Sequence, residues 1–404
     1  MRAVWIAGLL TPLAALGTDK GAHDPIVIQA DSDFAGCGCV LGGDGSISNP
    51  FVIGPWAINK VNGVAVSVDG TNLTKSFVIW NLTVAGNGTN SSIGVVLKNI
   101  NRGASRLFAA VAGVQTTIQA VGVGILVEGS NDVTLDGGGA NPSGAGIVAS
   151  GAGSINHNQS GAIDVENSSN IVVRGWQLSA NGLDGHPDWI GFDPSVANWG
   201  VGGVRFFGVT HSSIDHNASN NCTSISYSLF NSSYNMVSNN TADYPFTINF
   251  LVTGGSAYNS LSNNVAGTAD FVGYLVADPL PGTATLAAYG PTHDNTLSGN
   301  SSHADGPTGA EIKAGVAPAF VGAFVVLNGT FNNQITNNQD TTGVGFVWAQ
   351  AVPSTSSPIG VVSYPPLLHC NVTASEGGGG IGNRNGNAWT GNQFKMIDPC
   401  LPAQ

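Results

Sequence analysis

Acidic and basic side chains recur at matching positions of three neighbouring segments, in a chain that has few of them. The segments begin at Gly124, Gly161 and Gly202, and only 9% of the 404 residues are Asp, Glu, Lys or Arg. Each segment alternates polar with apolar residues, so we expect its polar side chains to share one outward face. Aligned on one another, the segments give three columns: Leu126, Asp164 and Arg205; Glu128, Glu166 and Phe207; Asp136, Arg174 and Asp215, with His216 beside the last.

Paired carboxylates in these columns could carry out acid–base chemistry. A glycoside hydrolase needs two carboxyl groups on either side of the bond that it cleaves. Asp164 with Asp215, or Asp136 with Asp164, would form such a pair. The competing interpretation is a solvated Asp–Arg–Asp ladder that neutralises stacked charge, in which each exposed pair contributes only about 0–1 kcal/mol.

A long segment between the Arg174 and Arg205 strands, residues 182–200, holds a second group of candidates. Long loops in compact proteins are often functional. Tryptophan rings offer flat apolar faces to sugar rings, while Asp and His can bond hydroxyl groups. The residues that we expect to contact substrate are Trp189, Trp199, His186 and Asp188, together with His216 from the third column. The alternative is that the tryptophans pack against the neighbouring strands.

Repetition predicts the elements that would position these residues. The turn asparagines Asn217, Asn240, Asn264, Asn300 and Asn338 are separated by 23, 24, 36 and 38 residues. Two of these intervals equal one coil of a parallel β-solenoid, and the other two equal a coil with an insertion. A propeller or a sandwich is a weaker alternative, because hairpin signals are scarce.

The alternation predicts which side chains fill the solenoid. Ile163 and Val165, Val204 and Phe206, and Ile171 and Val173 should point into the bore. Coils stack at about 4.8 Å, and each coil completes the backbone ladder of the next. Asparagine tolerates the left-handed conformation at corners, and stacked amides can bond from coil to coil.

Composition fits an all-β protein and narrows its partners. Glycine accounts for 57 residues and the hydrophobic fraction is 42%, which allows a long core with many turns. A net charge of −12 makes nucleic acid an unfavourable partner. It also repels anionic lipid and anionic sugar polymers, unless a cation bridges them.

The amino terminus resembles a secretory signal over residues 1–17, with Arg2 before an apolar run that ends at a small-residue site. We therefore expect a secreted, cell-surface or periplasmic protein with no membrane span. A lead-in and cap segment should occupy residues 18–60, the solenoid 61–350, and a C-terminal cap 351–404. Some Asn-x-Ser/Thr sites, among them Asn217, could carry glycans, although turn chemistry explains most of them.

Five cysteines cannot all pair within the chain. Cys37 and Cys39 are either small buried thiols or a strained disulfide, and a metal site there is a weaker alternative because no His or further Cys lies near. Cys370 and Cys400 could close the C-terminal tail with a disulfide.

Three stretches resemble a known group of proteins. Residues 44–58, DGSISNPFVIGPWAI, residues 75–84, KSFVIWNLTV, and residues 386–394, GNAWTGNQF, are similar to the opening, first coil and closing turn of right-handed parallel β-helix proteins. The relatives are NosD-like and pectate-lyase-like proteins associated with carbohydrates. The resemblance implies a single β-helix of about ten coils, with caps at both ends, but it specifies function poorly.

The resemblance also implies a mechanism. Lyases on this fold hold Ca²⁺ against a uronate with acidic side chains on adjacent coils, and an Arg or Lys removes the proton next to the carboxylate. Here Asp164, Glu166 and Glu128 would bind the metal, and Arg205 or Arg174 would be the base, although a guanidinium rarely loses its proton. Asp215 is a further catalytic candidate. Motifs of polygalacturonase-like hydrolases are absent from the sequence.

We therefore expect an exported β-helix that engages a polysaccharide along a groove over residues 126–216. If it is catalytic, a calcium-assisted lyase or epimerase is the favoured chemistry. The alternatives are a non-catalytic surface or adhesive solenoid and a periplasmic accessory protein for metal-enzyme maturation. An enzyme requires Asp164, Glu166 and Arg205 to converge at an open cleft, whereas a display protein would disperse or mutually neutralise them.

Overall fold

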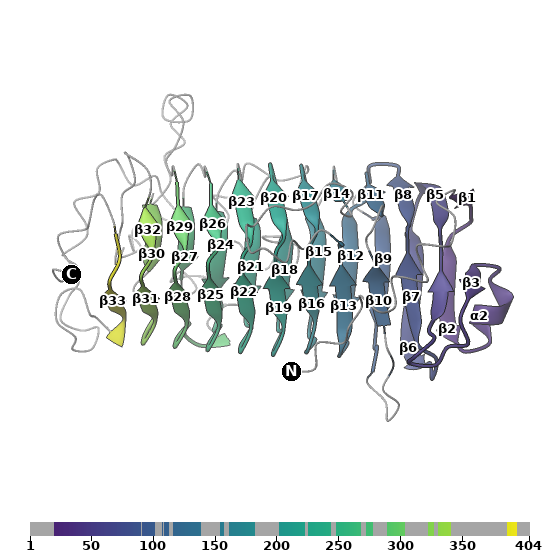
Figure 1. Ribbon diagram of the computed structural model, residues 1–404, viewed down its shortest axis with the longest axis horizontal. Coiled ribbons are helices and arrows are strands. Elements are labelled where there is room, and N and C mark those ends of the chain that lie inside the picture. Colours follow the sequence, from purple (N-terminus) through teal and green to yellow (C-terminus); the bar gives the residue numbers. More distant parts are fainter. Residues whose placement is uncertain are drawn as a thin grey trace.

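The chain forms one long stack of short strands, whose long axis is horizontal in Figure 1. The signal segment 1–17, Cys370 and Cys400 lie outside the residues that the structure describes, as does most of the segment 351–404. The computed structural model describes residues 20–89, 91–101, 107, 109–112, 116–138, 154–156, 161–181, 202–222, 225–243, 248–267, 272–277, 289–303, 322–326, 330–340 and 386–393.

Three sheets run the length of the stack, and every strand pairing in them is parallel except β3 with β4. The ten-stranded sheet contains β2 (Ile26–Ala30), β6 (Val64–Asn72), β9 (Ile93–Lys98), β12 (Val123–Glu128), β15 (Gly161–Glu166), β18 (Val204–Phe207), β21 (Ile225–Phe230), β24 (Ile248–Thr253), β27 (Val272–Val276) and β30 (Gly322–Val326). The twelve-stranded sheet contains β3 (Val40–Gly42), β4 (Phe51–Ile53), β7 (Phe77–Trp80), β10 (Ala109–Ala112), β13 (Val133–Asp136), β16 (Val172–Arg174), β19 (Ser213–Asp215), β22 (Met236–Ser238), β25 (Ser260–Ser262), β28 (Thr296–Ser298), β31 (Gln334–Thr336) and β33 (Ala388–Thr390). The eleven-stranded sheet contains β1 (Gly21–Ala22), β5 (Trp56–Val61), β8 (Thr83–Gly86), β11 (Thr117–Gln119), β14 (Ser154–Asn156), β17 (Gln177–Ser179), β20 (Ala218–Asn220), β23 (Thr241–Asp243), β26 (Val265–Ala266), β29 (Ser301–Ser302) and β32 (Gln339–Asp340).

From β4 onward, consecutive strands belong to different sheets, and each strand inside the stack pairs with the strand one coil earlier and one coil later. The chain passes from β15 to β16 to β17, for example, and then returns to the first sheet at β18, which pairs with β15. Such connectivity is that of a parallel β-helix. The all-β, right-handed parallel β-helix predicted from the sequence is confirmed.

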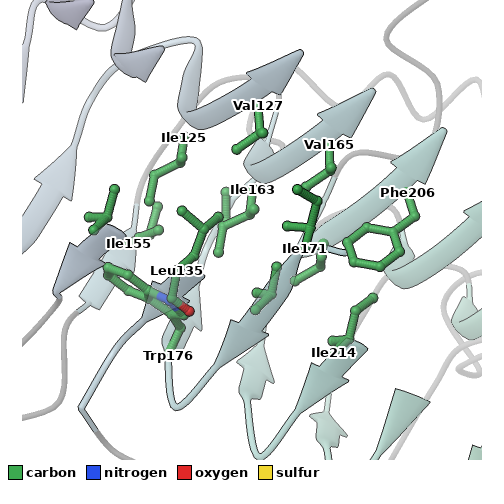
Figure 2. Packing of buried hydrophobic residues seen from close by; sticks show 14 of the residues in the cluster. Ile125, Val127, Leu135, Ile155, Ile163, Val165, Ile171, Trp176, Phe206 and Ile214 are labelled. Atoms are coloured by element: carbon green, nitrogen blue, oxygen red, sulfur yellow. The ribbon is translucent and has the colours of Figure 1, made fainter. Parts of the chain in front are cut away.

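The core fills the bore of the helix, as Figure 2 shows for its central coils. The six residues predicted to point inward are all fully buried: Ile163, Val165, Ile171, Val173, Val204 and Phe206. Further along, four rings stack inside the bore on successive coils, with centroids 5.0, 4.8 and 4.6 Å apart: Tyr227, Phe250, Tyr274 and Phe324. Because every coil packs on the next, the core is continuous.

Two asparagine ladders fix the corners on either side of the twelve-stranded sheet. In each, an Asn Oδ1 accepts bonds from both the backbone N–H and the Nδ2 of the Asn one coil earlier, at 2.8–3.1 Å. The first ladder contains Asn217, Asn240, Asn264, Asn300, Asn338 and Asn392, and the second contains Asn235, Asn259, Asn295, Asn333 and Asn387. The predicted stacking of amides is therefore confirmed for the first ladder, and the second extends it.

We expected the ladder asparagines to be the left-handed residues at these corners, but the left-handed residue is the one before each of them. Asn239, Asn263 and Asn337 have φ of 56°, 54° and 54°. The reason is that the ladder amide must point inward, where it is buried, while the preceding residue turns the chain. Turning and bonding are thus divided between two adjacent positions.

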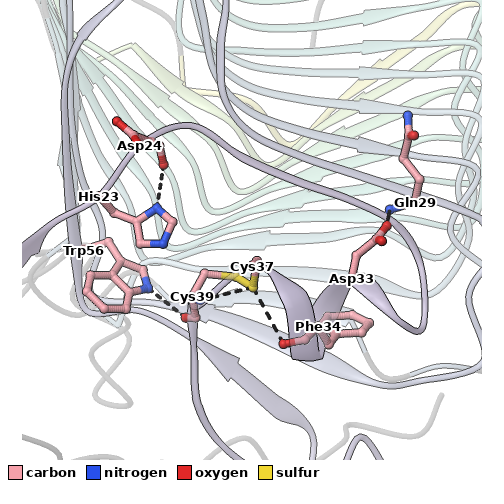
Figure 3. Close-up of a disulfide and its surroundings, with 8 residues drawn as sticks. All are labelled: His23, Asp24, Gln29, Asp33, Phe34, Cys37, Cys39 and Trp56. Atoms are coloured by element: carbon pink, nitrogen blue, oxygen red, sulfur yellow. Dashed lines mark hydrogen bonds between the residues drawn. A yellow bond between two sulfur atoms is a disulfide. The ribbon is translucent and has the colours of Figure 1, made fainter.

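The short helix α2 (Asp33–Gly36) lies at the N-terminal end of the stack, where Phe34 is buried in the core cluster. Cys37 and Cys39 form a disulfide, so the thiol and metal alternatives for this pair are wrong. Figure 3 shows the Trp56 indole N–H donating to the Cys39 carbonyl at 2.7 Å. Cys222 is a free, buried thiol. In the described parts of the chain no helix has the length and apolar character to span a membrane.

Candidate functional site

The three predicted columns exist in the register that the sequence indicated. Asp164 pairs with Leu126 on one side and Arg205 on the other, and Glu166 pairs with Glu128 and Phe207. In the twelve-stranded sheet the neighbours are Asp136, Arg174 and Asp215. The outward side chains of β12, β15 and β18 are thus brought together, since their neighbours along each strand fill the bore.

Asp164, Glu166 and Arg205 form a charge cluster. The Arg205 Nε donates to Asp164 Oδ1 at 2.8 Å and its Nη2 donates to Asp164 Oδ2 at 2.6 Å, a two-pronged pair. The same Nη2 lies 2.5 Å from Glu166 Oε1. Side-chain exposure is 5% for Arg205, 7% for Asp164 and 29% for Glu166, so solvent reaches the cluster through Glu166. The pair of Asp164 and Arg205 is therefore buried rather than solvated.

The cluster raises the pKa of two of its members. Burial raises the pKa of the Glu166 carboxyl, the charge of Asp164 raises it further, and Arg205 only partly opposes them. Burial alone would lower the pKa of Arg205, but the charges of Asp164 and Glu166 outweigh burial and the pKa is raised. A guanidinium held this way keeps its proton, which disfavours Arg205 as a base.

Each carboxylate predicted to bind calcium has a cation beside it. Arg205 contacts Asp164 and Glu166, while the Lys98 ammonium lies 2.5 Å from Glu128. Within the described ranges, no three His, Cys, Asp or Glu side chains are grouped so as to hold a metal ion. Calcium binding by Asp164, Glu166 and Glu128 therefore remains a prediction.

The third column splits into two local pairs. Arg174 bonds Asp136 at 2.7 Å. The Asp215 carboxylate lies 2.7 Å from His216 Nδ1 and also accepts bonds from Ser238 Oγ and Asn239 Nδ2. Among the described residues, none bonds to the buried Nε2 of His216. The arrangement orients His216 firmly, and the roles predicted for Arg174, Asp215 and His216 stay predictions.

Three aromatic rings, the aromatic trio, lie beyond Glu166, and two of them, Phe207 and Phe230, continue the second column. Phe207 and Phe230 stack on neighbouring coils with centroids 5.2 Å apart, and the Tyr289 ring meets both edge-on, at 6.2 and 5.4 Å. Tyr289 is 39% exposed. The Arg205 guanidinium lies over the Phe207 ring at 5.7 Å, which joins the trio to the charge cluster.

Five further rings, the aromatic strip, lie along the turns that lead into the twelve-stranded sheet. They are His211, Tyr234, Tyr258, His293 and Phe331, one per coil, each in contact with the next at centroid distances of 4.6–5.5 Å. Tyr234 and Tyr258 are about half exposed. Our sequence analysis missed this strip. The sequence does hold a sign of it: Tyr234 and Tyr258 directly precede Asn235 and Asn259, at positions where a turn-forming residue is expected.

The strip includes backbone strain. His211, Tyr234 and Tyr258 have φ of 54°, 60° and 57°, in the left-handed region. A side chain there costs roughly 1–2 kcal/mol, and only Gly, Asn and Asp tolerate it routinely. The equivalent positions in neighbouring coils are indeed Asp132, Asn170, Asp294 and Asn332.

The predicted substrate residues Trp189, Trp199, His186 and Asp188 all fall in residues 182–201, outside the described part of the chain. The structure therefore brings together only the strand residues of the predicted site.

No protein-family model matches this sequence, and no curated protein matches it either. Among solved structures, the Dettilon tailspike protein is similar with a TM-score of 0.45 and 12% identity, over 93% of this chain and 60% of that chain. A mannuronan C-5 epimerase A-module from Azotobacter vinelandii has a TM-score of 0.27 and 10% identity, over 86% of this chain and 91% of that one. A mutant of a periplasmic alginate epimerase has a TM-score of 0.27 and 14% identity, over 85% and 93%.

This chain thus spans about 60% of the tailspike's length. Its own strand pairings make it a parallel β-helix protein, as the sequence predicted.

Proposed function

We propose that the protein is exported and binds a polysaccharide along the outer face of its ten-stranded sheet, without turning it over. The observation that carries this proposal is the joined surface of Glu166, Arg205 and the aromatic trio, in which a partly exposed carboxylate adjoins two half-buried phenylalanine rings and the exposed ring of Tyr289. The stacked coils present this surface parallel to the axis of the helix, which suits an extended ligand.

Each part of the surface has a role in binding. Phe207 and Phe230 stack on one another, so they offer apolar ring edges to the C–H groups of a sugar, and Tyr289 adds a hydroxyl group. The Glu166 carboxylate can accept hydrogen bonds from sugar hydroxyls, because it is partly exposed and the described Arg205 contact is to its Oε1 atom. Asp164 positions Arg205 and is itself too buried to reach a ligand.

Mutual neutralisation argues for binding over catalysis. The enzyme hypothesis requires Asp164, Glu166 and Arg205 to converge, and they do. However, the cluster is closed by its own ion pairs, and the raised pKa of Arg205 opposes proton abstraction. A lyase or epimerase is therefore our second candidate, favoured by the convergence alone, with Ca²⁺ as the cation that it would need.

The proposal is tested by binding to a panel of neutral and acidic polysaccharides, measured by affinity electrophoresis and calorimetry. Phe230→Ala and Tyr289→Ala should each weaken binding several-fold, since one aromatic contact contributes about 0.5–1.5 kcal/mol beyond its buried area. Ile47→Ala, an exposed apolar residue between β3 and β4 and away from the ten-stranded sheet, is the control and should bind normally. No retained polysaccharide, or trio variants that bind as tightly as the control, would refute the proposal.

The second candidate has its own assay. Ultraviolet absorbance detects the unsaturated uronates that a lyase releases, with calcium present and then with excess chelator. A calcium-dependent signal that disappears in Arg205→Ala would replace binding with catalysis as the main function.

A further inference from the structure

The aromatic strip is the part of the described surface that packing explains least. Its rings lie outside the bore, with Tyr234 and Tyr258 about half exposed. Three of the five residues adopt a left-handed backbone in which a bulky side chain is unfavourable. Asn would relieve that strain, and Asn occupies the same position at 170 and 332. Strain retained at an exposed position is a reason to look for a function there.

The strip borders a surface of small hydroxyl groups. The twelve-stranded sheet begins one or two residues after each of these turns, and its outward side chains are only partly buried. Beside the strip these include Ser213, Ser260 and Thr296, with Ser238, Ser262 and Ser298 in the next row and Met236 as the apolar exception. A protein-binding surface has an apolar centre, whereas hydroxyl rows beside aromatic rings suit a sugar.

Charge indicates which class of sugar would bind. The turns that hold the strip contain no Lys or Arg, and Asp294 is their one acidic residue. The charge of Asp294 is the largest cause that raises the pKa of Tyr258, so this phenol remains a hydrogen-bond donor well above neutral pH. With a net charge of −12 on the whole chain, nothing here attracts a polyanion.

We propose that the aromatic strip is a second carbohydrate-binding surface, which takes a neutral, hydroxyl-rich polysaccharide lying parallel to the helix axis. The inference rests on the proposed function for its class of ligand, but on different residues. His211, Tyr234 and Tyr258 cover one another's faces by stacking, so the ligand meets ring edges and phenol hydroxyls, and the sheet's serines complete the contact.

Length should matter as well as charge. One ring per coil over five coils gives a strip about 19 Å long, from four steps of about 4.8 Å. Affinity for neutral oligosaccharides should therefore rise with chain length and level off once the strip is spanned.

The test uses Tyr234→Asn and Tyr258→Asn, singly and together, in the full chain. Because Asn suits the left-handed position, the variants should unfold at the same temperature as the unaltered protein or higher. The double variant should bind an uncharged glucan or mannan at least tenfold more weakly. Phe230→Ala serves as the comparison at the other surface, and Ile47→Ala as the remote control.

The outcomes separate the two proposals. If the tyrosine variants bind normally while Phe230→Ala does not, the strip is not a binding surface and the proposed function stands. If they unfold at a lower temperature and bind normally, the strip only stabilises the fold. If the tyrosine variants bind a uronate polymer more weakly but bind a neutral glucan normally, the strip binds an acidic polysaccharide, and the neutral ligand class proposed here is wrong. If the unaltered protein binds no polysaccharide, both proposals fail.

Discussion

A buried charge pair makes Asp164 a structural residue, whatever the ligand. Its carboxylate holds both Nε and Nη2 of Arg205, and both side chains are shielded from solvent. Removing one partner of such a pair leaves an uncompensated buried charge and costs about 3–5 kcal/mol. We expect Asp164→Asn to lower the free energy of unfolding by about this amount. Glu166 also contacts Arg205, but it neutralises the guanidinium charge only in part.

The same column supplies the control for this substitution. Glu128 pairs with Lys98 at the surface, where each side chain is more than 40% exposed. Glu128→Gln should change stability by about 0–1 kcal/mol. Denaturant unfolding measures the free energy of unfolding of both variants. Equal losses would show that burying the pair of Asp164 and Arg205 adds nothing to the cost of breaking it.

Glu166 should make stability depend on pH. Its pKa is raised in the folded state, mainly by burial and then by Asp164. A carboxyl group of this kind stabilises the fold fully below its unfolded pKa, about 4.3, and that stabilisation is lost as the pH rises through the folded pKa. Glu166→Gln, which stays neutral, should therefore gain stability relative to the unaltered protein as the pH rises from about 4 to neutral. A constant difference across that range in thermal unfolding would contradict the assignment.

Among elements, the corners are fixed by asparagine ladders more than by the strands, which are often three residues long. Asn264 accepts two bonds from Asn240 and donates to the Val237 carbonyl. Each buried group left without a partner costs about 1–3 kcal/mol. Asn264→Ala should thus destabilise the protein by at least about 2 kcal/mol, whereas Ser262→Ala on the outer face should be nearly neutral. Similar losses in the two variants, measured by denaturant unfolding, would argue against the ladder.

The sequence predicts the strands and their register well, for a physical reason. Asparagines spaced by 23 and 24 residues mark coils without insertions, and alternation around Ile163 and Val204 fixes which side chains enter the bore. The register of Asp164 with Arg205 follows from these anchors. What alternation does not reveal is how far an outward side chain is covered, so the burial of that pair was missed. The aromatic strip was missed because turn residues carry no periodic hydrophobic signal.

For the whole molecule, the coil-on-coil architecture predicts graded stability. Each coil contacts its two neighbours, so the energetics approximate a linear array of interfaces, and coils near the ends have one stacking neighbour fewer to hold them. Amide hydrogen exchange should therefore be slowest in the central strands β12 to β24 and faster toward β2 and β31. Uniform protection along the stack would instead mean that the helix opens as a single unit.

The asparagine ladder also constrains how the protein can be made. Asn217 and Asn300 stand in Asn-x-Ser sequences, yet both side chains are buried and their Nδ2 atoms donate to Val173 and Leu261 carbonyls. An oligosaccharyltransferase acts on a chain before it folds, and a glycan at either amide would occupy the space of the adjoining coil. The amide of Asn81 is also buried and stands before Leu82 and Thr83 in a sequence of this type. Production in a eukaryotic secretory host should therefore yield retained, misfolded material, and replacing Thr83, Ser219 and Ser302 with alanine should restore export there. In a bacterial host that does not glycosylate asparagine, the coils should stack normally.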